Sequence, residues 1–245
     1  GLKIIQNEVI ASKTLKYLNL GIIERSFRRN NFNGEGGMIL ARILLNNTSI
    51  ETLILQDNEL GEDSGDKIGA SLIQNKTLRH LVVADNKIKN KGARSIIENG
   101  NHLVSINLAN NDISPEVCYA LKTLIVNSSY LKDVVWDGNV IGLKGINYIV
   151  DGLRESKKIR TLSLKNTSIG VAGMQNLAEG LFNNNSIEVI VSDLENEIEQ
   201  ENNDKDTNYN YTTTCSTSSN STLIQYAKAT RSQNSFIKFN NKLRH

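Results

Sequence analysis

LKDVVWDGNVIGLKGINYIVDGLRESKKIRTLSL, residues 131–164, holds the unit from which we derive the fold of this 245-residue chain. The unit opens on the apolar positions Leu131, Val134 and Trp136, continues through Asn139, and ends where the next apolar start begins at Ile159. Starts of this kind recur at a spacing that is 28 residues in four of its six steps: Leu15, Ile50, Leu78, Leu103, Leu131, Ile159 and Ile187. A fixed period of this length indicates stacked structural repeats.

Each unit is predicted to contain one short strand and one helix. In IETLILQDN, the apolar Leu53 and Leu55 alternate with side chains of the other face, which is the period of a strand with one buried face. In GMQNLAEGLF, the positions Leu177, Ala178 and Leu181 have the spacing of the buried stripe of a helix. One strand and one helix cannot bury both stripes, whereas stacked neighbours can. We therefore expect an α/β solenoid, with a parallel strand ribbon on its concave face and helices on its convex face.

Two further positions recur with the repeat. An asparagine-type residue follows the apolar triplet, and we expect its amide to bond turn backbone groups where the chain leaves the strand. These residues are Asn30, Asn58, Asn86, Asn111, Asn139 and the variant Thr167. A mostly small residue comes six positions later: Gly36, Ser64, Gly92, Val117, Gly145 and Gly173.

With these positions in place, the chain resembles the leucine-rich repeat family, in its 28-residue ribonuclease-inhibitor-like class. The resemblance covers about residues 1–193 and implies a horseshoe of about six repeats preceded by an N-terminal helix. Most members of the family act as binding platforms. The resemblance therefore implies a non-catalytic scaffold that binds a protein partner.

Beyond the array the repeat pattern stops. Residues 194–221 begin with an acidic run and continue into a polar, low-complexity stretch, for which we expect a disordered loop. Residues 222–245 regain helical apolar spacing, and we interpret them as a degenerate last repeat that caps the core. The alternative is a disordered tail.

Composition excludes several classes of protein. A net charge of +2 gives no argument for attraction to nucleic acid or membrane, and two cysteines exclude a disulfide framework. The sequence has no apolar run of membrane-spanning length and no signal peptide, so we expect a cytoplasmic monomer. It also lacks metal-ligand spacings, phosphate loops and nucleophile elbows, and we expect neither a cofactor nor catalysis.

The predicted concave face supplies the candidate binding site. Alternation along each strand places every second side chain on this face, where Ile54, Val82 and Val135 are apolar and their neighbours form a polar rim. β-branched residues are also favoured in strands for their propensity alone, so this pattern has a purely structural alternative. The candidate residues are Tyr17, Asn19, Thr52, Ile54, Gln56, His80, Val82, Asn107, Asp133, Val135, Asp137, Ser163 and Lys165.

An insertion in the first unit is a second candidate contact. Seven extra residues lie between Leu20 and Asn30, and insertions in repeat proteins map to loops on one rim. The loop carries three basic residues beside an aromatic one, which suits an acidic partner or a phosphate; the alternative is a solvated loop. Its candidate residues are Arg25, Phe27, Arg28 and Arg29.

A regulatory function is the alternative to a simple scaffold. The same repeat class includes Ran GTPase activators and tropomodulin-like proteins, and VVWDGN looks like part of a repeat in actin-regulatory scaffolds of the CARMIL type. This resemblance implies a regulator of a small GTPase or of actin assembly. Nucleotide-dependent immune signalling is a third possibility, but the sequence contains no nucleotide-binding module.

Overall fold

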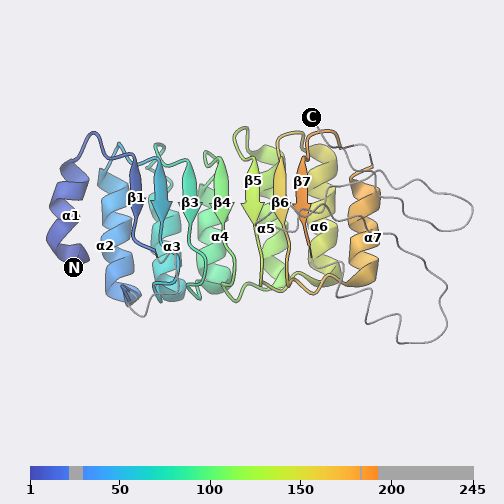
Figure 1. Cartoon of the computed structure of the whole chain (residues 1–245), viewed down its shortest axis with the longest axis horizontal. Helices are drawn as coiled ribbons and strands as arrows, with labels where there is room; N and C mark the ends of the chain where they lie inside the picture. The colour runs from blue at the N-terminus through green and yellow to red at the C-terminus, as the bar shows by residue number, and fades with distance from the viewer. Residues whose placement is uncertain (22–29, 183, 193–245) are drawn as a thin grey trace, which may run out of the picture.

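Parallel strands stacked in chain order form the sheet of the molecule (Figure 1). The structure is a computed structural model, and it describes residues 1–21, 30–182 and 184–192. Within these residues the sheet has seven strands in the order β1-β2-β3-β4-β5-β6-β7, which confirms the predicted parallel ribbon. The strands are β1 (Tyr17–Asn19), β2 (Thr52–Ile54), β3 (His80–Val82), β4 (Ser105–Asn107), β5 (Asp133–Val135), β6 (Thr161–Ser163) and β7 (Val189–Val191).

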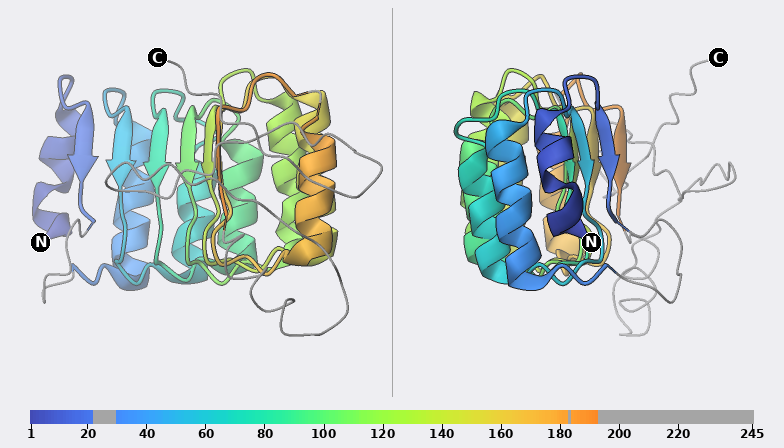
Figure 2. Two further views of the ribbon diagram at one scale, coloured as in Figure 1. Left: turned by 45° about the vertical axis from the view of Figure 1, so that its right-hand side comes forward. Right: turned by 90° about the vertical axis from the view of Figure 1, so that its left-hand side faces the viewer.

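Helices form the second layer, on one side of the sheet only (Figure 2). The N-terminal helix is α1, and one helical segment follows each of β1 to β6. The α-helices are α1 (Leu2–Ala11), α2 (Asn33–Asn46), α3 (Gly61–Ser71), α4 (Lys89–Asn99), α5 (Cys118–Asn127), α6 (Gly142–Glu155) and α7 (Gly170–Gly180), and the short 3-10 helix η1 (Pro115–Val117) leads into α5. The other face of the sheet carries no helix in the described part of the chain.

The core is a continuous apolar layer between strands and helices. The central residue of each inner strand, such as Leu53, Leu81 and Ile106, is buried. Trp136 occupies the same inward position as leucines in other units and is fully buried, so the single tryptophan fills the core. The recurring small positions are buried as well, where neighbouring helices meet.

Asparagine side chains connect successive units at the edge where the strands end. In Asn111, Nδ2 donates to the carbonyls of Val83, Leu108 and Ala109. Its Oδ1 accepts from the backbone N–H groups of Asn86 and Ile88. Asn86 and Asn139 repeat the arrangement, so the predicted role of this position is confirmed. We call this set, Asn58, Asn86, Asn111 and Asn139, the strand-end ladder.

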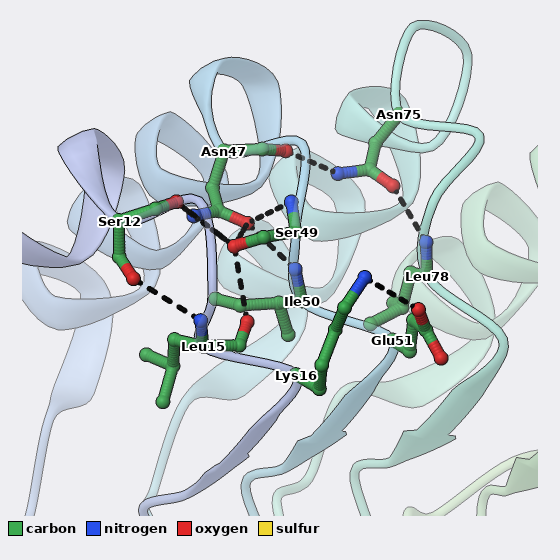
Figure 3. A network of polar contacts seen from close by, with 9 residues as sticks. All are labelled: Ser12, Leu15, Lys16, Asn47, Ser49, Ile50, Glu51, Asn75 and Leu78. Atoms are coloured by element: carbon green, nitrogen blue, oxygen red, sulfur yellow. Dashed lines mark hydrogen bonds and ion pairs between the residues drawn. The ribbon is translucent and has the colours of Figure 1, made fainter.

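A second ladder, which the repeat pattern did not predict, ties the helix ends to the strand starts (Figure 3). Asn47 donates from Nδ2 to the carbonyls of Val9 and Ser12, and its Oδ1 accepts from Ser49 and Ile50. The same arrangement recurs one unit later at Asn75. Related bonds are made by Ser128 and Asn184, and together with Asn47 and Asn75 they form the helix-end ladder.

Three predictions fall on residues that the structure does not describe. The inserted loop with Arg25, Phe27, Arg28 and Arg29 lies in 22–29. The acidic, low-complexity segment 194–221 and the expected cap 222–245 lie beyond residue 192.

Candidate functional site

The candidate site is the face of the sheet that the helices leave uncovered, which we call the open sheet face. Parallel register aligns its side chains in columns that cross all the strands. The first column contains Tyr17, Thr52, His80, Ser105, Asp133, Thr161 and Val189, and the second contains Asn19, Ile54, Val82, Asn107, Val135, Ser163 and Val191. These are the columns that alternation predicts. The structure therefore aligns the candidate residues of β1 to β6 along one face of the sheet.

Aliphatic side chains lie on this face over β2, β3, β5 and β7, and in the described sheet they stand on adjacent strands only at β2 and β3. Ile54 and Val82 are register partners on β2 and β3, and both side chains are partly exposed. Val135 is also partly exposed, but Asn107 on β4 separates it from Val82. In the second column, the adjacent pair Ile54 and Val82 is therefore followed by a polar residue before the next apolar one. At the β1 edge, Tyr17 is 54% exposed, which makes it the most accessible aromatic side chain of the open sheet face.

Two residues predicted as polar contacts for a partner, Asp137 and Ser163, already form hydrogen bonds within the chain. Asp137 Oδ1 accepts from the Ser163 hydroxyl at 2.7 Å and from the Lys165 backbone N–H at 2.9 Å. Ser163 is only 6% exposed, so it offers little surface to a partner. These bonds hold the exits of β5 and β6 together, which gives Asp137 and Ser163 a positioning role within the sheet.

Two asparagines of the second column cap the turns that follow their strands. Asn107 Oδ1 accepts from the Ala109 N–H, and Asn19 Oδ1 accepts from the Gly21 N–H, both at 3.0 Å. Both amide oxygens are therefore already used within the chain. Gln56, beyond the end of β2, donates to Asp85 at 3.0 Å.

The described titratable groups of this face are not arranged as a nucleophile with an adjacent, oriented base. His80, Ser105 and Asp133 stand on three adjacent strands in that order. The serine therefore separates Asp133 from His80, whereas in a catalytic triad the acid lies beside the base and orients it. Cys118 lies inside the core, and burial raises the pKa of its thiol to about 12. Within the described residues, no three His, Cys, Asp or Glu side chains come together as a metal site.

The edge where the strands begin carries side chains that the repeat pattern did not predict as a contact site. Arg79, directly before β3, donates from Nη1 to the carbonyl of His102 at 2.9 Å. Its guanidinium lies over the ring of Tyr130, 5.3 Å from the ring centroid. The signal that could have pointed to this edge is the residue immediately before each strand, which is basic in several units.

Comparison with known protein families and sequences gives three matches. A family described as Leucine Rich repeat matches residues 74–96 and 101–122. The chain is 24% identical over 193 residues to mouse "NACHT, LRR and PYD domains-containing protein 14", covering 76% of this chain and 19% of the relative. It is 27% identical over 175 residues to mouse "NACHT, LRR and PYD domains-containing protein 12", covering 69% of this chain and 17% of the relative. The chain thus spans less than a fifth of either relative.

Among solved structures, the tropomodulin C-terminal domain of Caenorhabditis elegans superposes with a TM-score of 0.43 at 14% identity. The superposition covers 83% of this chain and 97% of that chain. None of the helices in the described ranges has the length and apolar character needed to cross a membrane.

Proposed function

We propose that this chain, a leucine-rich repeat protein of the ribonuclease-inhibitor-like class, is a non-catalytic scaffold that binds another protein on the open sheet face. The relatives named above contain further domains by their names, and the match covers only a small share of their length. Their activities are therefore not transferred to this chain.

The observation that carries the proposal is the Ile54–Val82 pair. These side chains lie side by side on adjacent strands, away from the helices, and both are partly exposed. Around them stand Tyr17, His80 and Asn107, which supply an aromatic contact and polar groups. A partly exposed apolar centre within a polar surround is the usual composition of a protein contact surface.

A preformed surface also favours binding. The strand-end and helix-end ladders join neighbouring units through buried hydrogen bonds at Asn47, Asn75, Asn111 and Asn139 and a partly buried one at Asn184. A surface held in this way loses little conformational entropy when a partner docks. The partner is a protein, and a cytoplasmic location and a monomeric state remain predictions.

Affinity capture with paired substitutions tests the contact surface. The chain is immobilised, exposed to a cell lysate, and its bound proteins are identified by mass spectrometry. Ile54→Asp combined with Val135→Asp places two charges on the open sheet face, and we expect the specifically recovered partner to be lost. The matched control is Met38→Asp with Ile73→Asp, because both residues are apolar, more than 60% exposed and outside the sheet. Circular dichroism verifies that both double variants remain folded.

Equal recovery with both double variants would place the contact elsewhere and would contradict the proposal. Acceleration of GTP hydrolysis by a small GTPase in the presence of the chain would instead favour the regulatory alternative.

A further inference from the structure

The strand-start edge carries a second row of aligned side chains, outside the open sheet face. Backbone hydrogen bonds continue one residue before the strands: Val104 N–H donates to Arg79 O at 2.7 Å, Lys132 N–H to Val104 O at 2.8 Å, and Arg160 N–H to Lys132 O at 2.8 Å. The residue before each strand is therefore a register neighbour of the next. In order, this row contains Lys16, Glu51, Arg79, Val104, Lys132, Arg160 and Glu188.

Charge is distributed unevenly along this row. At one end, Lys16 lies 2.7 Å from Glu51, and the hydrogen bond from Lys16 lowers the pKa of the Glu51 carboxyl. At the other end, Arg160 lies 3.6 Å from Glu188. Between these pairs the row contains only Arg79, Val104 and Lys132, and no carboxylate.

Further cations flank the middle of the row. Lys76 and Lys158 are exposed in the connections that lead to β3 and β6. Lys76 Nζ donates to the carbonyl of Leu72 at 2.9 Å, which holds that ammonium at the edge. We define the basic rim as Lys76, Arg79, Lys132, Lys158 and Arg160. Within the residues that the structure describes, only Arg160 of this set lies within ion-pair distance of a carboxylate.

Arg79 is held in place by two contacts that leave donors free. Its Nη1 bond to His102 O fixes one end of the guanidinium, and the Tyr130 ring lies against its face. A guanidinium has five N–H donors in one plane, so the remaining donors are available to a carboxylate. His102 itself is buried, and desolvation, followed by the charges of Lys76 and Arg79, lowers its pKa to about 4. The imidazole is neutral at pH 7 and adds no charge.

The length of the basic rim limits how long a bound peptide segment can be. Adjacent strands are about 4.8 Å apart, so the three strand intervals from Arg79 to Arg160 span about 14 Å. An extended peptide rises about 3.3 Å per residue, and roughly five residues cover this length. The opposite edge, where the strands end, carries Asp57, Asp85, Asp112 and Asp137. Together with a net charge of only +2, these carboxylates disfavour a long polyanion such as nucleic acid.

We propose that the basic rim binds a short acidic segment of a partner protein, with its carboxylates placed against Arg79 and Lys132. This contact lies on the strand-start edge and does not depend on partner binding by the open sheet face. Such a contact would fix the direction in which a partner lies along the strand row, since aligned charges set register and orientation more than affinity.

Binding of a fluorescein-labelled hexaglutamate peptide tests the proposal by fluorescence anisotropy at low ionic strength, with the full chain. We expect the wild-type chain to bind hexaglutamate and not hexaglutamine. Lys132→Glu with Lys158→Glu should weaken binding by about tenfold or more, because two attractive charges become repulsive. Raising the salt concentration should weaken wild-type binding as well.

The matched control is Lys67→Glu with Lys144→Glu. Both lysines are exposed on helices α3 and α6, and the double variant has the same net charge as the rim variant. We expect its affinity for hexaglutamate to stay within about twofold of the wild type. Equal losses in the two double variants, or no wild-type binding, would overturn the proposal. Tighter lysine-dependent binding of a short DNA duplex or of phosphatidylserine vesicles would also overturn it, in favour of another class of ligand.

Discussion

At the scale of single residues, Asn111 shows why the repeat keeps one amide. Its side chain satisfies three carbonyls and two N–H groups from two successive units. These groups lie just beyond the ends of β3 and β4, where the Ala109 carbonyl also accepts from the Asp85 backbone N–H. Thr167, at the same position two units later, donates its hydroxyl to Leu164 O at 2.7 Å. The asparagine side chain carries both N–H donors and a carbonyl acceptor. It can therefore satisfy backbone carbonyls and backbone N–H groups together, which a threonine hydroxyl cannot do to the same extent.

Replacement of Asn111 tests this account. We expect Asn111→Ala to lower the free energy of unfolding by about 3 kcal/mol or more, because buried backbone groups lose their partners at about 1–3 kcal/mol each. Urea-induced unfolding followed by circular dichroism measures the change. The control is Asn101→Ala, at an exposed asparagine, with an expected change within about 0.5 kcal/mol. Equal effects of the two substitutions would contradict the role given to the strand-end ladder.

His102 makes stability depend on pH. Its folded-state pKa of about 4 lies below the value of 6.5 for an unperturbed histidine. Between these values the unfolded chain binds a proton that the folded chain does not. The contribution of His102 to the free energy of unfolding is therefore complete above pH 6.5 and declines as the pH falls toward 4, by on the order of 3 kcal/mol in total.

The His102→Leu variant isolates this contribution, since leucine does not titrate. Urea unfolding midpoints at pH 7 and pH 4.5 should differ more in the wild type than in the variant. If the variant kept the full pH dependence of the wild type, another group would be responsible.

At the scale of elements, close packing of neighbouring helices depends on small residues. A Cβ added at Gly65 in α3 would lie 2.8 Å from Ile88 Cβ and 2.9 Å from Gly92 Cα, which belongs to α4. The two helices therefore pack with backbone nearly against backbone at this point. This contact explains why the position six residues after the asparagine is small in most units; Gly92 occupies it after Asn86.

Gly65→Ala tests the packing of α3 against α4. We expect a loss of about 1–3 kcal/mol in the free energy of unfolding, because the added methyl group requires the helices to separate. Gly34→Ala in α2 is the matched control, since nothing lies within 4 Å of its added Cβ. Alanine is the better helix former, so this control should be neutral or slightly stabilising. Thermal unfolding distinguishes the two, and a neutral result for Gly65→Ala would contradict the packing argument.

At the scale of the whole molecule, two ladders and one apolar layer make a frame that repeats along the chain. The frame leaves the open sheet face and the strand-start edge as separate surfaces, one partly apolar and one basic. At the N-terminal end, Leu15, Leu18 and Leu20 are only partly buried, whereas Ile50, Leu53 and Leu55 of the next unit are buried. The internal units therefore contribute the most complete burial, as expected for a solenoid in which each unit contacts its neighbours.

The sequence by itself determined the parallel strand order, the two columns of the open sheet face, the buried place of Trp136 and the role of the strand-end asparagines. Each of these follows from a local pattern that recurs with the repeat, because identical units stack in register and alternation then assigns each side chain to a face. Only the tertiary structure decided which polar groups meet between units. The helix-end ladder, the Asp137–Ser163 bond that withdraws two candidate residues, and the placing of Arg79 over Tyr130 all join residues whose partners belong to other units. The repeat pattern does not predict the distance between side chains of different units. That distance depends on how the units stack.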